Sequence, residues 1–182
     1  NPPEEDISFE DNTALVEGGP TTTMPCEAEE GVEEDVYSIA VAAPDDTLDR
    51  DRLYPPGVWR LPQGEGDLGQ RMANCLAQFG PHPALIVGSD IPDINRRHVA
   101  AAFDKLRRNE LVFGPSDDGG YWLVGAAQGA RVGNLFNDVR WSTEHALVDT
   151  LENVRSGVRV AMLEPLEDID DGAAYRDWRN GR

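Results

Sequence analysis

The sequence predicts an α/β protein in which a mixed, mainly parallel sheet lies between two layers of helices. Apolar runs typical of buried strands alternate along the chain with segments whose apolar residues recur at helical spacing. The chain has 182 residues, close to the roughly 150 that one domain needs, and 40% of them are hydrophobic. A chain of this size and composition can bury a core of its own.

The expected strands are short and rich in aliphatic and β-branched residues. The first clear strand covers 36–42 and ends before the turn residues Pro44 and Asp45. Residues 84–88, Ala-Leu-Ile-Val-Gly, are typical of a strand that is buried on both faces. Further strands are expected at 111–113, 121–125 and 158–163. Before residue 36, only the apolar pieces at 7–9 and 14–16 could form a strand.

Helices are expected between these strands. Apolar residues at helical spacing predict a helix over 67–79, after a Pro- and Gly-rich loop at 54–66. Asn95 is the expected cap of a helix that ends near residue 108. Ser142 is the expected cap of a helix over 143–156, and a last short helix is expected over 171–179.

The negative charge is concentrated near the N-terminus. The net charge is −18, from 34 acidic and 16 basic residues, and 15 of the acidic residues lie in 1–49, where no Lys or Arg occurs. Residues 1–35 are therefore expected to be an acidic segment of tail or loops, and 36–182 an α/β domain. Such acidity argues against binding to nucleic acid or to anionic lipid.

The chain is expected to work in the cytoplasm. Cys26 and Cys75 are too few for a disulfide scaffold, and neither has a CxxC neighbour. No apolar run reaches the ~18 residues that a bilayer span requires, and no signal peptide pattern is present.

Three acidic clusters lie where a ligand site is expected in an open α/β sheet, at the carboxyl ends of strands. They are 88–93 after the apolar strand, 114–121 between two short strands, and 168–171 after the strand that ends at Leu163. Carboxylates in such places suit Mg²⁺ or Mn²⁺, which take one or two of them together with water and substrate phosphates. Asp and Gly also favour turns, so each cluster alone has a plain structural explanation.

A Gly-rich loop at 63–69 opens the expected helix at 67–79. The free N–H groups of a helix N-terminus can bind an anion, and Arg71, one turn further, could add a charged fork. A loop that merely caps the helix is an equally good explanation. The P-loop pattern is absent.

Five segments, in this order, resemble the DUF2064 proteins, a GT-A-like family related to nucleotide-diphospho-sugar transferases that includes selenodomain-associated and arsenosugar-type glycosyltransferases. They cover 66–72, 87–92, 113–125, 135–143 and 168–171, and the segment Phe-Gly-Pro-Ser-Asp-Asp-Gly-Gly-Tyr-Trp-Leu-Val-Gly is the most specific of them. The resemblance extends over about 36–178.

The resemblance implies a Rossmann-like GT-A fold and a metal-dependent transfer of a sugar from a nucleotide-diphospho-sugar to a small acceptor. It implies Mg²⁺ or Mn²⁺ at Asp90, with Asp170 as a second ligand, and Asp118 as the candidate catalytic base. Residues implied to bind the nucleotide or the other substrate are Gly64, Gly66, Asp67, Arg71, Asp117, Gly119, Gly120, Tyr121 and Trp141.

One departure from the family pattern keeps other functions open. The family's first strand is followed by a basic loop that binds phosphates, whereas residues 1–35 contain no Lys or Arg. The alternatives are a guanylyltransferase-like nucleotidyltransferase and a non-catalytic relative that has lost the donor phosphate loop. If the first strand is missing, the exposed sheet edge would favour a homodimer.

Overall fold

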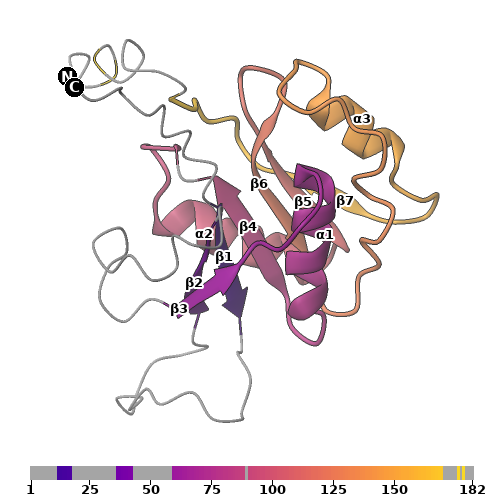
Figure 1. Cartoon of the computed structure of the whole chain (residues 1–182). Coiled ribbons are helices and arrows are strands. Elements are labelled where there is room, and N and C mark those ends of the chain that lie inside the picture. Colours follow the sequence, from indigo (N-terminus) through magenta and orange to yellow (C-terminus); the bar gives the residue numbers. More distant parts are fainter. Residues whose placement is uncertain are drawn as a thin grey trace, which may run out of the picture.

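The computed structural model describes residues 12–17, 36–42, 59–88, 90–169, 176 and 178 (Figure 1). Its centre is a seven-stranded sheet with the order β3-β2-β1-β4-β6-β5-β7. The strands are β1 (Asn12–Glu17), β2 (Val36–Ala42), β3 (Trp59–Pro62), β4 (Ala84–Gly88), β5 (Leu111–Pro115), β6 (Tyr121–Ala126) and β7 (Val160–Met162). The helices are α1 (Leu68–Gln78), α2 (Arg96–Leu106) and α3 (Ala146–Glu152).

The predicted mixed sheet is confirmed, and its two reversed strands lie inside it. Strand β1 is antiparallel to both of its neighbours, β2 and β4, and β6 is antiparallel to β4 and β5. The pairs β2–β3 and β5–β7 are parallel. The other five strands therefore all run in one direction, so that β4, β5 and β7 end at the same edge of the sheet.

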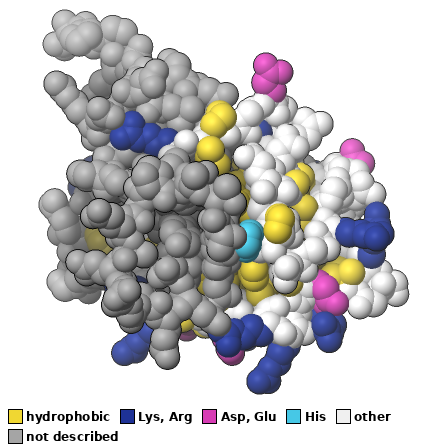
Figure 2. Space-filling model, turned by 90° about the horizontal axis from the view of Figure 1, so that it is seen from below, with side chains coloured by type: hydrophobic (Ala, Val, Ile, Leu, Met, Phe, Trp, Pro, Cys, Tyr) yellow, Lys and Arg dark blue, Asp and Glu magenta, His cyan; other side chains and the backbone are white. Residues whose placement is uncertain are grey.

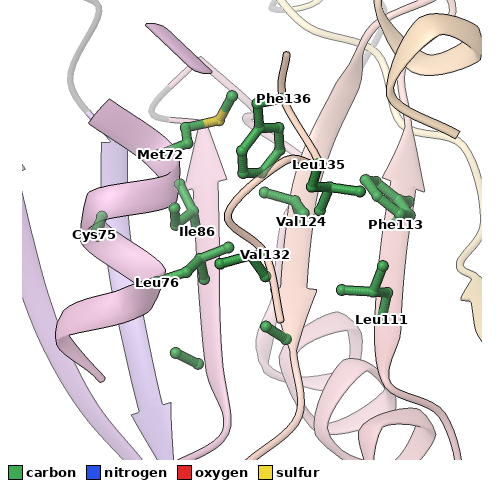
Figure 3. Packing of buried hydrophobic residues seen from close by; sticks show 12 residues of the cluster. Met72, Cys75, Leu76, Ile86, Leu111, Phe113, Val124, Val132, Leu135 and Phe136 are labelled. Carbon is green, nitrogen blue, oxygen red and sulfur yellow. The ribbon is translucent and has the colours of Figure 1, made fainter. Parts of the chain in front are cut away.

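The sheet separates two apolar clusters, which gives the expected three layers. On one face, Met72, Cys75 and Leu76 of α1 pack against alternate residues of β4, β5 and β6 and against the segment 132–136 (Figure 3). On the other face, Phe103 and Leu106 of α2 pack against Leu85, Val112 and Leu123, among others. This alternation along the strands is the two-residue period of a sheet covered on both faces.

Several predicted elements agree with the structure to within a few residues, because local signals define them. β2 has the predicted bounds, and α1 and α2 begin at capping boxes. The Asp67 carboxylate accepts a hydrogen bond from the Gln70 N–H at 2.8 Å, and the Asn95 side chain accepts one from the Arg97 N–H at 2.9 Å. These bonds satisfy N–H groups that have no partner within the helix.

Two strands lie where the sequence indicates loops. β3 falls within the loop expected at 54–66, and its residues pair with β2 in parallel register. β1 contains the apolar piece at 14–16 and fills the position between β2 and β4. β1 has a paired strand on each side, so no sheet edge is exposed between β2 and β4. The expectation of a homodimer assumed an exposed edge at this position.

The helix expected over 143–156 is shorter than predicted, and Ser142 does not cap it. α3 covers Ala146–Glu152 with His145 at its N-cap position. Ser142 has φ 56°, in the left-handed region, whereas a capping residue is extended. Thr143 organises the turn instead: its hydroxyl donates to the Arg140 carbonyl at 2.7 Å and accepts from the His145 N–H at 3.2 Å. The helix expected over 171–179 lies mostly outside the described residues.

The described surface has mixed charge. Figure 2 shows Lys and Arg side chains beside Asp and Glu side chains along its rim. This matches a sequence in which residues 50–182 hold 19 acidic and 16 basic residues. Within the part of the chain that the structure describes, no helix is both long and apolar enough to span a membrane.

Gly114 leaves room for the buried indole of Trp122, and we expect Gly114→Ala to destabilise the fold. An added Cβ would lie 2.3 Å from Trp122 Cε2, and the rigid ring is only 2% exposed. Such overpacking costs about 1–3 kcal/mol in urea unfolding. Gly133→Ala is the control, because no heavy atom lies within 4 Å of its Cβ. Equal stability of the two variants would contradict this account.

Burial raises the pKa of the Cys75 thiol to about 12. The unfolded thiol loses its proton above pH ~8.5, while the folded thiol keeps it, so the free energy of unfolding should fall as the pH rises through this window. Between pH 8 and pH 10 the protein should lose about 1–2 kcal/mol more than Cys75→Ala, whose core has no thiol. Chemical denaturation at both pH values measures this, and equal losses would show that the thiol is not protected.

Candidate functional site

A cleft of about 240 Å³ opens at the edge of the sheet where β4 and β5 end and β6 begins. It is bounded by the first turns of α1, the loop after β4, the β5–β6 turn, the segment before α3 and the stretch after β7. Its lining residues are Leu68, Met72, Ile86, Gly88, Asp90, Ile91, Ser116, Asp118, Gly120, Tyr121, Trp122, Leu123, Val124, Trp141, Ser142, Thr143, Ala146 and Asp168. This is the edge at which open α/β sheets bind ligands.

Asp90 lies directly beyond β4, and Gly88 makes room for its carboxylate. A Cβ at position 88 would be 2.8 Å from Asp90 Oδ1. The backbone of Asp90 is held by a distant part of the chain, because its carbonyl accepts the Ile169 N–H at 3.0 Å. Asp168, which precedes Ile169, lines the same cleft. Two carboxylate residues 78 positions apart in the sequence are thereby brought to one site.

The chain reaches Asp168 by continuing beside β5 after β7 ends. The Leu163 N–H donates to the Phe113 carbonyl at 2.8 Å, and the Leu166 N–H donates to the Pro115 carbonyl at 3.1 Å. Residues Ser116 and Leu166 also form a parallel bridge. Asp168 is therefore positioned by sheet-like pairing that runs as far as Leu166, close to the edge of the cleft.

The β5–β6 turn holds Asp118 in a fixed orientation. The Gly120 N–H donates to Asp118 Oδ1 at 2.7 Å, while the Ser116 N–H donates to the Gly120 carbonyl at 3.1 Å. Gly119 has φ +89°, a conformation that favours glycine. One oxygen of the Asp118 carboxylate thus supports the turn, and the residue is exposed at the mouth of the cleft.

Aromatic rings form one wall of the cleft. Trp141 lies edge-on to Tyr121, with ring centroids 6.4 Å apart, and its centroid is 6.2 Å from that of Phe136. Tyr121 in turn packs edge-on against Phe113. Burial raises the pKa of the Tyr121 phenol far above its usual range, so this group stays neutral. The wall is therefore aromatic and uncharged.

The charged groups that line the cleft, among the residues that the structure describes, are all acidic: Asp90, Asp118 and Asp168. Three carboxylates in a partly enclosed space repel an anion and favour a cation or hydroxyl donors. No group of three or more His, Cys, Asp or Glu suited to a metal occurs within the described ranges.

The remaining predicted site residues lie elsewhere. Gly64 and Gly66 belong to the loop before α1, both with positive φ, and neither lines the cleft. Arg71 donates from Nη1 to Gln63 Oε1 at 2.8 Å and is also outside the lining. Asp67 caps α1 and borders a separate groove between α1 and 130–138. Asp117 is exposed on the β5–β6 turn.

Gly119 does not line the cleft but joins two of its walls. Its carbonyl accepts the Leu147 N–H at 3.0 Å, and an added Cβ would meet the Glu144 carbonyl oxygen at 2.3 Å. Asp170, the predicted second metal ligand, lies outside the described residues, two positions beyond Asp168.

Sequence reasoning missed Ser142 and Thr143 as lining residues because it assigned them to a helix start. The left-handed conformation of Ser142 has no sequence signal of its own. Gly88 lies in the predicted cluster 88–93 but had no role assigned to it, although a glycine between a buried strand and an acidic residue is a usable signal of close approach to a side chain.

The fold is an α/β sandwich with a cleft at the carboxyl edge of its sheet, and it is similar to the fold of a solved structure. A crystal structure from Desulfovibrio desulfuricans G20, called a "putative nucleotide-diphospho-sugar transferase", has a TM-score of 0.64 to this chain and 27% sequence identity. The similarity covers 71% of this chain and 58% of the other. The chain thus spans less than two thirds of that neighbour's length.

The chain belongs to DUF2064, described as a family of uncharacterized proteins conserved in bacteria, whose model matches residues 29–143. The match includes β2, the β5–β6 turn and Trp141, and it confirms the family resemblance in the sequence. No curated protein matches the chain.

Gly119→Ala should separate the two walls that Gly119 joins. Its Cβ would meet the Glu144 backbone, and its positive φ adds strain. Gly129→Ala is a matched control, because Gly129 also has positive φ (+73°) but no heavy atom within 4 Å of its Cβ. In urea unfolding, Gly119→Ala should cost about 1–3 kcal/mol more than the control. An equal cost would mean that the contact with Glu144 adds nothing.

Proposed function

We propose that this protein binds the sugar end of a nucleotide-diphospho-sugar in the edge cleft and transfers that sugar to a small hydroxyl-bearing acceptor. The observation that carries the proposal is the convergence of Asp90, Asp118 and Asp168 on one cleft at the carboxyl edge of this fold. The similarity to a protein called a nucleotide-diphospho-sugar transferase supports the same donor class.

We further propose that Asp90 holds Mg²⁺ or Mn²⁺ together with Asp168 and the predicted second ligand Asp170. The ligand chemistry suits such an ion, because the carboxylate residues Asp90 and Asp168 both line the cleft. Mg²⁺ needs only one or two carboxylates and takes its other ligands from water and phosphate oxygens. When bound, the ion would neutralise the donor diphosphate and stabilise it as a leaving group. The acidic side chains among the described lining residues support a cation beside an anionic donor.

The proposed roles of the side chains follow from their places. Asp118, fixed through one oxygen by the Gly120 N–H, would use its other oxygen to accept the proton of the acceptor hydroxyl. Trp141 and Tyr121 would offer an apolar wall to the substrate and exclude water from one side. A volume of about 240 Å³ suits a sugar or small polyol rather than a whole nucleotide sugar.

The acidity of the cleft supports a second candidate, a non-catalytic relative that binds an uncharged polyol. Carboxylates accept hydrogen bonds from hydroxyls without any metal. Nucleotidyl transfer, the other alternative, shares the metal requirement and differs by releasing pyrophosphate.

A thermal-shift panel of nucleotide sugars and nucleoside triphosphates, with MnCl₂ or MgCl₂ and then with EDTA, tests the proposal. A donor at about 100 times its Kd adds ~2.7 kcal/mol to the free energy of unfolding, which raises Tm clearly. We expect a shift with one nucleotide sugar that EDTA abolishes. Asp90→Asn should lose this shift, because it removes a metal ligand.

Asp104→Asn serves as the control, since Asp104 is an exposed acid on α2 outside the cleft, and it should keep the shift. An unchanged shift in Asp90→Asn would refute the metal assignment. A panel without any shift, from a folded protein, would refute sugar transfer and favour the non-catalytic candidate, which titration with simple polyols would then examine.

A further inference from the structure

An ion pair outside the cleft fastens the segment that forms its aromatic wall. Asp149, on α3, accepts three hydrogen bonds from one residue: from the Arg140 backbone N–H at 3.0 Å, from Nε at 2.8 Å and from Nη2 at 2.7 Å. The two-pronged guanidinium contact fixes geometry as well as charge. The side chain of Asp149 is 11% exposed and that of Arg140 is 57% exposed.

The segment between these two residues carries four of the cleft's lining residues, Trp141, Ser142, Thr143 and Ala146. Its path includes Ser142 in the left-handed region, a conformation that is costly for a residue with a side chain. Thr143 closes the turn by donating to the Arg140 carbonyl. A strained path of this kind persists only when surrounding contacts hold it.

α3 alone is too short to keep the segment 141–143 in this conformation. It has seven residues, and isolated helices shorter than about 12–15 residues are marginal in water. Its position depends on contacts at both ends: the Leu147 N–H bonds to the Gly119 carbonyl, and Asn153 Nδ2 donates to the Asn137 carbonyl at 2.7 Å. The Arg140–Asp149 pair links the start of the wall segment to this helix.

We propose that Arg140 and Asp149 are positioning residues, which hold the Trp141–Thr143 wall against the Gly119 turn and thereby set the affinity of the cleft for its substrate. The effect on substrate affinity rests on the proposed function. The effect on the position of the segment 141–143 does not depend on it. The Arg140 guanidinium keeps the pKa of the Asp149 carboxyl well below its usual range, so the pair stays charged at neutral pH.

The chain contains a matched control. At the opposite end of the sheet, Glu110 accepts the same three donors from Arg159: the backbone N–H at 2.9 Å, Nε at 3.1 Å and Nη2 at 3.3 Å. Neither residue lines the cleft. Asp149 is only 11% exposed, whereas Glu110 is 39% exposed, so Asp149→Ala should lower the unfolding midpoint more than Glu110→Ala does. Exchange at Leu147 is therefore compared in each variant with exchange of the β4 and β6 amides, which reports any global loss of stability. Only the first should change the cleft.

The experiment compares backbone hydrogen exchange in the full chain for wild type, Asp149→Ala and Glu110→Ala. Loss of charge-assisted bonds should speed exchange of the Leu147 N–H about tenfold in Asp149→Ala, and by less than about twofold in Glu110→Ala. Unchanged exchange at Leu147 in Asp149→Ala, or an equal change in both variants, would overturn the proposal.

The second measurement is the Kd of the nucleotide sugar, with MnCl₂, that gives the largest shift in the panel. Asp149→Ala should weaken it roughly tenfold, as loss of a supporting residue does in other sites, and Glu110→Ala should leave it unchanged. Unchanged binding despite faster exchange would overturn the link to affinity. If wild type binds no nucleotide sugar, the proposed function fails, and the exchange of Leu147 alone decides whether the pair holds the wall.

Discussion

The contact between the Gly119 backbone and the segment before α3 is the constraint on which the cleft depends. It brings the β5–β6 turn, which carries Asp118, against the chain that carries Trp141. The absence of a side chain at Gly119 permits the approach, and the bond from the Leu147 N–H fixes it. The sheet supplies the rest, because β4 and β5 end at this edge and the chain after β7 runs on beside β5. Acidic side chains and an aromatic wall therefore meet at one cleft.

The elements that could be predicted from the sequence are those with local causes. Capping boxes mark the starts of α1 and α2, and the apolar run of β4 needs no knowledge of its neighbours. β3 could not be predicted, because its four residues form a strand only through pairing with β2. The start of α3 could not be predicted either, since Ser142 looks like a cap and only the surrounding contacts place it in the left-handed region.

The same distinction applies to the site. Acidic turns after strands predicted that Asp90, Asp118 and the 168–171 cluster would lie at one edge, because topology alone brings such turns together. The glycines at 64 and 66 matched a phosphate-binding pattern equally well, yet they shape the loop before α1 away from the cleft. A glycine pattern reports a need for backbone freedom, and only the fold shows whether a turn or a ligand uses it.

The charge of the cleft limits what its substrate can be. With three carboxylates and no basic side chain among its described lining residues, the site favours hydroxyl groups and cations over a bare phosphate. Its small volume and apolar wall suit the sugar end of a donor or a small polyol acceptor. Under the proposed function, a diphosphate would approach beside a divalent ion held by Asp90 and Asp168. Affinity for the nucleotide should therefore depend on the metal, while affinity for the sugar should depend on how firmly the Trp141 wall is held.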